Sequence, residues 1–171
     1  AVWTAHRVLP LNVTGYGQLI GASIEAAQRF REFLDHLTFT VNGKTIEVYP
    51  LNHPDFNMVN WVFKEQGCTD LNAINELNEK MFDRSSYMDG DVYGERFITS
   101  HTTFTQEDYG DSPIRFVERM GLTKEEWKKE QKITLLRAAI MTPYLNDDRI
   151  FNFYTKKIAK AMEKKLNEII Q

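Results

Sequence analysis

Hydrophobic residues recur at helical spacing in three long stretches of the chain. Between about residues 18 and 37 they fall at intervals of three and four, which places them on one face of a helix: Ile20, Ile24, Ala27, Phe30 and Leu34. A second helix is predicted from a cap at Thr69 to about Arg84, and a third from Asp147 to Ile170. Residues 1–7 also read as helical and end before Pro10.

Other stretches favour strands. Asn42-Gly43 separates two β-prone runs, 38–41 and 45–49, and Asn-Gly in that setting is a strong signal for a hairpin. Runs rich in β-branched and aromatic residues predict further strands at 56–63, 96–105 and 133–141. Between these elements we expect a polar loop at 85–94 and a short helix at 124–130.

The predicted order is helix, hairpin, strand, helix, strand, strand, helix. This order indicates the α+β class, with an antiparallel sheet and helices packed on one face. A chain of 171 residues fits one domain, or one domain with an added arm.

Composition and charge narrow the possible functions. The net charge is −3, and the lysines near the carboxyl end alternate with Glu163 and Glu168, which is typical of a solvated helix face; no nucleic-acid partner is expected. Cys68 is the only cysteine, so no internal disulfide can form and a reducing cytoplasm is the expected compartment. No apolar run approaches the roughly 18 residues of a membrane helix, so no membrane partner is expected. The chain begins Ala1-Val2-Trp3 in what reads as the middle of a helix, so we expect a fragment.

The motifs of several enzyme classes are missing from the sequence. Its four histidines form no close pair with metal-ligand spacing, so we expect no metal site: His6, His36, His53 and His101. No serine lies in a Gly-x-Ser-x-Gly motif. Gly15 and Gly17 are interpreted as turn residues, since no predicted strand precedes them.

Arg137 is the most informative polar residue, because it lies inside the otherwise apolar run 133–140. A buried arginine needs an anionic partner, since its charge is not removed by deprotonation. One interpretation is a salt bridge to a nearby Asp or Glu. The other is an arginine that points from a strand towards a substrate carboxylate. Ser100 and His101 lie on the preceding predicted strand, where they could sit beside Arg137; taken alone, such residues are typical of hydrogen-bonded strands.

Three segments resemble the end of the group II pyridoxal-phosphate decarboxylases, the family of aromatic-amino-acid and glutamate decarboxylases. These are the helix entry 1–7 with the following helix 15–34, the strand Phe97-Ile98-Thr99-Ser100-His101-Thr102, and the strand and turn Leu136-Arg137-Ala138-Ala139-Ile140-Met141-Thr142-Pro143. Within the family, Thr142-Pro143-Tyr144-Leu145-Asn146, the hairpin at Asn42-Gly43 and the long insertion between Ser100 and Ile133 look most like the bacterial tyrosine decarboxylases.

The resemblance implies a cofactor and a role for Arg137. Members of the family bind pyridoxal phosphate through a lysine that follows a histidine, and no histidine here is followed by lysine. The cofactor-binding part is therefore expected upstream, and the fragment alone should not catalyse decarboxylation. Arg137 matches the family's small-domain arginine, which contacts the substrate's α-carboxylate. Ser100 and His101 are further candidates for the substrate pocket.

The same resemblance implies a division of the chain and a partner. Residues 1–37 are expected to be the end of the large domain and a connecting helix, and 38–171 the small C-terminal domain of a fold-type I enzyme. Family members form homodimers with active sites at the subunit interface. Two alternatives stay open: a related decarboxylase acting on glutamate or DOPA, and a non-catalytic dimerisation or interaction module.

Overall fold

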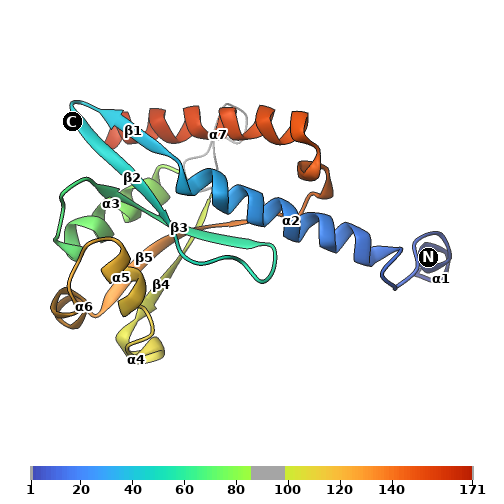
Figure 1. Cartoon of the computed structure of the whole chain (residues 1–171), viewed down its shortest axis with the longest axis horizontal. Helices are drawn as coiled ribbons and strands as arrows, with labels where there is room; N and C mark the ends of the chain where they lie inside the picture. The colour runs from blue at the N-terminus through green and yellow to red at the C-terminus, as the bar shows by residue number, and fades with distance from the viewer. Residues whose placement is uncertain (1, 86–98, 171) are drawn as a thin grey trace.

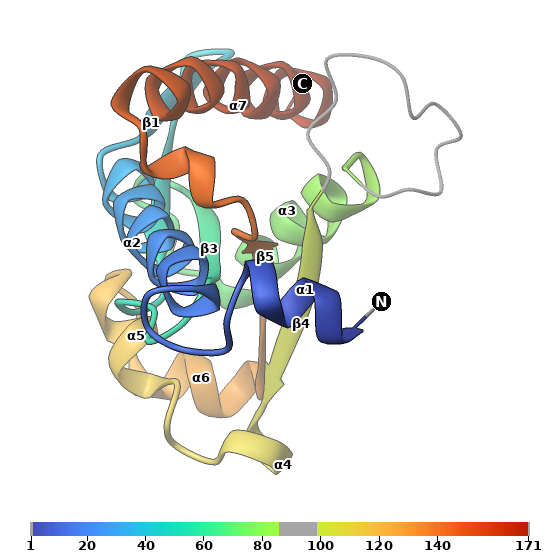
Figure 2. The ribbon, with the colours of Figure 1, turned by 90° about the vertical axis from the view of Figure 1, so that its right-hand side faces the viewer.

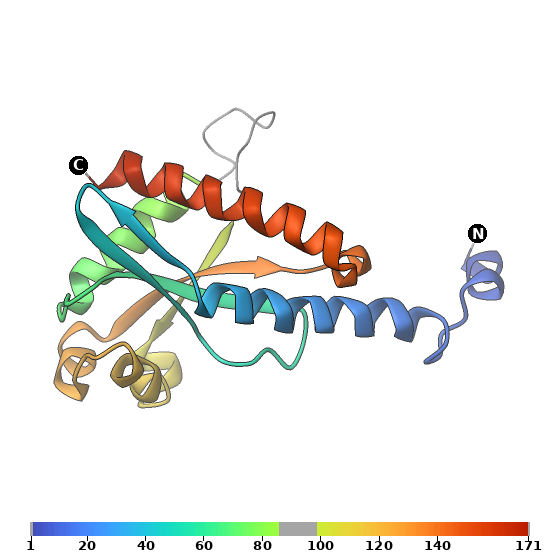
Figure 3. The same ribbon diagram turned by 45° about the horizontal axis from the view of Figure 1, so that its top comes forward.

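The computed structural model describes residues 2–85 and 99–170. In chain order the elements are α1 (Val2–Val8), α2 (Tyr16–Asp35), β1 (Thr38–Val41), β2 (Lys44–Pro50), β3 (Met58–Glu65), α3 (Leu71–Asp83), β4 (Ser100–Thr105), α4 (Gln106–Tyr109), α5 (Ile114–Arg119), α6 (Lys124–Glu130), β5 (Lys132–Ala139), η2 (Pro143–Asn146) and α7 (Asp148–Ile169). Figure 1 shows α1 beyond the amino-terminal end of α2, away from the sheet, and Figure 3 agrees.

A single open sheet organises the fold. Its strands lie in the order β1-β2-β3-β5-β4, and every neighbouring pair is antiparallel. The predicted α+β class and antiparallel sheet are confirmed. The order places β5, the last strand of the chain, between β3 and β4, so its two edges face residues far away in the sequence.

The predicted hairpin joins β1 to β2. Asn42 has φ of 50° and Gly43 has φ of 80°, so both central residues of the turn are left-handed. This conformation belongs to the tight turns whose twist matches that of the flanking strands, and Asn and Gly adopt it most readily. Asn42 also donates from Nδ2 to the carbonyl oxygen of Ile170 at 2.6 Å, which ties the turn to the end of α7.

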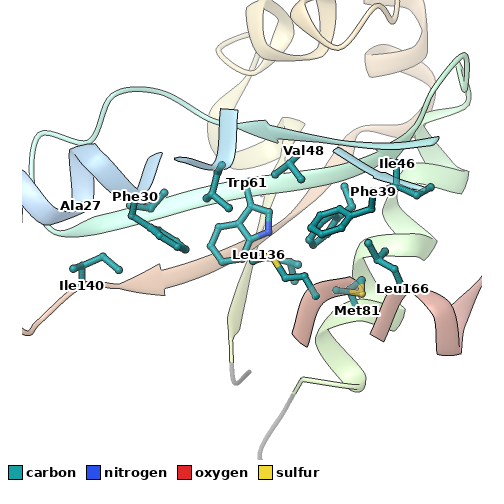
Figure 4. Packing of buried hydrophobic residues seen from close by; sticks show 14 of the residues in the cluster. Ala27, Phe30, Phe39, Ile46, Val48, Trp61, Met81, Leu136, Ile140 and Leu166 are labelled. Atoms are coloured by element: carbon teal, nitrogen blue, oxygen red, sulfur yellow. The ribbon is translucent and has the colours of Figure 1, made fainter. Parts of the chain in front are cut away.

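The two long helices cover one face of the sheet, as Figures 1 and 3 show. Phe30 and Leu34 of α2 and Leu166 of α7 belong to a buried cluster with Trp61 of β3 and Leu136 of β5. Figure 4 shows this packing, in which the Trp61 ring lies at the centre of the apolar side chains. At roughly 25 cal/mol for each Å² of apolar surface buried, such side chains supply most of the driving force for folding.

A second buried cluster lies on the opposite face. Side chains alternate along a strand, so Val62 and Leu135, the neighbours of Trp61 and Leu136, point the other way. They pack with residues of the short helices α5 and α6, including Val117 and Trp127. Helix α6 lies where a short helix was predicted, but the expectation that the helices pack on one face of the sheet needs correction. Figure 2 shows α5 and α6 across the sheet from α7.

Helix α3 fills the space where β3 and β5 part. Pairing between these strands runs from Met58–Ala139 to Trp61–Leu136 and stops there. Beyond that point Asn78 bonds to the backbone of Phe63 in β3, and Asn75 bonds to the backbone of β5.

Several predicted boundaries need correction. The cap of α3 is Asp70 and not Thr69, because the Asp70 carboxylate accepts the Asn72 N–H. The strand predicted at 56–63 lies at 58–65. Of the strand predicted at 96–105, residues 96–98 lie outside the described part, as does most of the predicted loop 85–94. Helix α7 begins at Asp148, one residue after the predicted start, with Asp147 as its cap.

Among the helices of the described residues, none has both the length and the apolar character needed to cross a membrane.

Candidate functional site

Arg137 lies where β5 emerges from the core. Residues 133–136 are buried, Arg137 and Ala138 are half-buried, and Ala139 is exposed. The predicted strand is therefore buried for only part of its length. Its arginine is placed at the border between the core and solvent, where a charged group keeps part of its hydration.

A row of three polar residues crosses the sheet at this border. Asn60 of β3 and Ser100 of β4 are the residues directly opposite Arg137 on its two neighbouring strands. Residues directly opposite one another share a face of the sheet, with Cβ atoms about 5 Å apart. Asn60, Arg137 and Ser100 form what we call the polar row.

The Ser100 hydroxyl holds Arg137 through both its side chain and its backbone. Nε of Arg137 donates to Ser100 Oγ at 3.1 Å, and Ser100 Oγ lies 3.1 Å from the Arg137 carbonyl oxygen, to which it donates. Thr99 Oγ1 donates to the same carbonyl at 2.8 Å. The predicted proximity of Ser100 to Arg137 is confirmed.

The guanidinium has no carboxylate partner within the described residues. No Asp or Glu there lies within 4.0 Å of it, and the Ser100 hydroxyl is its hydrogen-bond partner. The simpler interpretation, a salt bridge inside the domain, thus finds no support in residues 2–85 and 99–170. Nε is bonded to Ser100, and no described residue accepts from the two NH₂ groups at the other end of the guanidinium. That end matches the shape of a carboxylate.

The sheet face beside Arg137 is open at this end. Met58 and Ala139 pair with each other two positions further along the ladder, on the same face as Arg137, and both are exposed, with 50% of Met58 accessible. The cluster around α5 and α6 covers the other end of this face, where Val62 and Leu135 are fully buried. Arg137 is accordingly the charged residue at the edge of an uncovered surface.

His101 faces the opposite side of the sheet from Arg137. Adjacent strand residues point to opposite faces, and the His101 ring lies 3.9 Å from the ring of Phe82 on α3, measured between centroids. The structure therefore brings Ser100 to Arg137 and separates His101 from it. The place of His101 in a substrate pocket stays a prediction.

Asn60 was not among the residues that the sequence singled out. Its signal is a polar side chain inside the apolar run Val59–Val62. Asn60 becomes a candidate because it pairs with Arg137 on the neighbouring strand. The two residues are 77 positions apart, and a single sequence does not show that they pair.

Two further features bear on the chemistry. Among the described residues, no group of three or more His, Cys, Asp or Glu side chains is placed to hold a metal ion. A hollow of about 990 Å³ lies between η2 and the start of α7, with Tyr144, Phe153 and Tyr154 in its wall. The polar row does not line it.

Comparison with known proteins identifies relatives across the whole chain. The family "Tyrosine decarboxylase, C-terminal" matches residues 26–166. An L-tyrosine decarboxylase of Enterococcus faecium is 93% identical over all 171 residues. Proteins of the same name from Enterococcus faecalis and Levilactobacillus brevis are 55% and 49% identical over 99% of the chain. The chain spans only 28%, 27% and 27% of the lengths of these three relatives.

Proposed function

Because the chain belongs to the family of tyrosine decarboxylase C-terminal domains, we propose that it is the C-terminal portion of a pyridoxal-phosphate-dependent L-tyrosine decarboxylase. The reaction of the full-length enzyme is the conversion of tyrosine to tyramine and carbon dioxide. The names of the relatives, at 93%, 55% and 49% identity, support this substrate.

The observation that carries the proposal is the NH₂ end of Arg137 on the open part of the sheet, which has no hydrogen-bond acceptor among residues 2–85 and 99–170. A carboxylate bound there would accept two parallel N–H bonds, the strongest and most directional arrangement an arginine offers. We propose that this carboxylate is the α-carboxylate of the amino acid. Ser100 would hold the guanidinium by accepting from Nε, at the 3.1 Å distance observed.

The job of Arg137 in this proposal is orientation. By binding the α-carboxylate, Arg137 would fix the direction of the bond that breaks, and a misplacement of about 1 Å can cost on the order of 10²-fold in rate. Very tight binding of the carboxylate in the ground state would slow its departure. Arg137 therefore accelerates the reaction only by orienting the carboxylate. A half-buried arginine with one neutral partner suits that requirement, because part of its charge stays solvated.

The residues described here do not fit a binding site for pyridoxal phosphate. Two lysines of the domain are buried, and both are engaged elsewhere. Lys64 lies over the Tyr49 ring, with Nζ 5.8 Å from its centroid, and Lys165 donates to the carbonyl oxygen of Arg84. Neither amine belongs to the polar row. We propose that the rest of the polypeptide, which makes up most of each relative's length, holds the cofactor and supplies its electron-withdrawing chemistry.

Further parts of the proposal concern the whole enzyme. We propose that residues 1–37 connect the large domain to the small domain 38–171; α1 buries no side chain, whereas α2 buries Ala26, Phe30 and Leu34 against the sheet. A homodimer and a cytoplasmic location are proposed on the family's pattern. Glutamate and DOPA are the alternative substrates. The alternative to an enzyme is a non-catalytic dimerisation or interaction module.

Carbon dioxide release by the full-length enzyme tests the proposal. The enzyme would be supplied with pyridoxal phosphate and offered tyrosine, DOPA, phenylalanine, histidine and glutamate separately. The expected result is release from tyrosine above the others. If more carbon dioxide were released from glutamate or DOPA, that amino acid would replace tyrosine as the proposed substrate. If none of the five amino acids released carbon dioxide, the non-catalytic module would be favoured.

A further inference from the structure

We propose that Asn60 is a positioning residue for Arg137: its side-chain oxygen accepts a hydrogen bond from the guanidinium while the arginine holds the substrate carboxylate. This inference rests on the proposed function. Asn60 is not in any of the segments on which the resemblance to the decarboxylases was based. It is argued from the pairing of Asn60 with Arg137, from the unpaired side-chain oxygen of Asn60, and from the charges of the two side chains.

The register places Asn60 on the side of Arg137 that Ser100 leaves open. Arg137 is in β5, with β4 on one side and β3 on the other, and both partners are directly opposite it. Ser100 accepts from Nε on the β4 side. A guanidinium held on one side alone can still turn about that bond. A second acceptor on the β3 side would fix the plane of the fork.

The Asn60 side chain carries an acceptor with nothing to accept. Its Oδ1 is buried, and in the described part of the chain no donor reaches it. Leaving a buried acceptor unpaired costs free energy, so such atoms in folded proteins usually have a purpose or a partner in another state. Arg137 is the cross-strand neighbour that has N–H groups to spare, because its described hydrogen bond uses only Nε. The two groups complement each other.

Charge explains why an amide suits this position better than a carboxylate. A neutral acceptor orients the guanidinium and leaves its positive charge for the substrate. An aspartate in the same place would form an ion pair with Arg137 and compete with the α-carboxylate. The polar row therefore contains two neutral acceptors around one cation, and its single net charge is available to the ligand.

Steady-state kinetics of the full-length enzyme test the inference. The variants are Asn60→Ala, Asn60→Asp and Arg137→Ala, with Asn52→Ala as a control that removes the same amide from an exposed loop position. For each we would measure kcat and KM for tyrosine, inhibition by tyramine, and the melting temperature. Tyramine keeps the ring and amine of the substrate but has no carboxylate, so it reports on the rest of the pocket.

We expect Asn60→Ala to lower kcat/KM for tyrosine on the order of 10-fold, in line with the loss of a hydrogen bond to a charged group. Tyramine inhibition and the melting temperature should stay at the wild-type values, because the lost bond exists only around the bound carboxylate. Asn60→Asp should lower kcat/KM further than Asn60→Ala, through competition for Arg137. Asn52→Ala should behave as wild type.

Two results would overturn the role of Asn60 alone. One is an impaired Arg137→Ala enzyme beside an unimpaired Asn60→Ala enzyme. The other is an Asn60→Ala enzyme that melts earlier and loses tyrosine turnover and tyramine affinity together, which is the behaviour of a structural residue. By contrast, a wild-type enzyme that releases no carbon dioxide from tyrosine, or an Arg137→Ala variant as active as wild type, would overturn the proposed function and Asn60 with it.

Discussion

Asn78 of α3 bonds to both backbone polar groups of Phe63 in β3, as a neighbouring strand would. Its Oδ1 accepts the Phe63 N–H at 2.8 Å, and its Nδ2 donates to the Phe63 carbonyl at 2.8 Å. One turn earlier, Asn75 does the same for β5, accepting from Thr134 N at 2.9 Å and donating to the Lys132 carbonyl at 3.1 Å. The helix thereby satisfies backbone groups that the parting strands leave without a ladder.

This arrangement matters for the polar row. The strands β3 and β5 are paired only from Met58–Ala139 to Trp61–Leu136, and the pair Asn60–Arg137 lies within that short ladder. The asparagines of α3 fix the two strands just beyond it. We infer that they stabilise the register on which the relation between Asn60 and Arg137 depends.

Removal of the Asn78 amide should destabilise the domain. Asn78→Ala leaves the Phe63 N–H and carbonyl buried without partners, at a cost of about 1–3 kcal/mol for each group. We expect the free energy of unfolding to fall by roughly 2–5 kcal/mol in urea denaturation. Asn72→Ala is the matched control, because Asn72 is exposed on the same helix. Equal stability of the two variants would contradict the role given to Asn78.

The Ser100 hydroxyl should matter for turnover through Arg137. Ser100→Ala removes the acceptor of the Nε–H, so the guanidinium loses its observed side-chain partner. We expect kcat/KM for tyrosine in the full-length enzyme to fall on the order of 10-fold. Ser100→Thr keeps a hydroxyl at the position and should retain more activity than Ser100→Ala. If the two variants were equally impaired, the hydroxyl would not be the group that matters.

Tyr49 should make stability fall in strongly alkaline solution. Burial, and then its hydrogen bond to the Glu47 carboxylate, raise the pKa of Tyr49 from 10.0 to about 12. The folded chain therefore keeps this proton where the unfolded chain releases it. The stabilisation is complete below pH 10.0 and is lost as the pH rises to about 12.

Tyr49→Phe removes that titration and tests it. Unfolding in urea, followed at a series of pH values across this interval, should show a shallower loss of stability for the variant than for the wild-type chain. Glu47→Gln removes the acceptor's charge and lowers the pKa of Tyr49 in the folded chain, so the loss of stability should be smaller and end at a lower pH. A slope that is identical in Tyr49→Phe and wild type would exclude Tyr49 as its source.

Much of the fold follows from local patterns in the sequence. The spacing of Phe30 and Leu34 predicts the buried face of α2, and Asn42-Gly43 predicts the hairpin with its two left-handed residues. Short-range signals are sufficient in these cases because the physical cause is local. The cap of α3 is less certain from sequence, since Thr69 and Asp70 are both good cap residues and only the backbone geometry selects one.

The site depends on relations that a single sequence does not contain. Ser100 and His101 are neighbours in the chain, yet only Ser100 shares a face with Arg137, because the strand register decides which residue of the pair points that way. The bonds from Asn75 and Asn78 likewise require the positions of two strands far away in the sequence. The apolar run around Arg137 marks this residue in the sequence and the resemblance implies its role, whereas its pairing with Asn60 is found only in the structure.

The role of Arg137 is tested by the kinetics of Arg137→Ala in the full-length enzyme with tyrosine as substrate. Arg115→Ala, which removes an exposed arginine of α5, is the control. We expect Arg137→Ala to lower kcat/KM on the order of 10²-fold or more, while tyramine inhibition and the melting temperature are unchanged. Arg115→Ala should match wild type. An Arg137→Ala enzyme that decarboxylates tyrosine as well as wild type would contradict the assignment of this arginine to the substrate carboxylate.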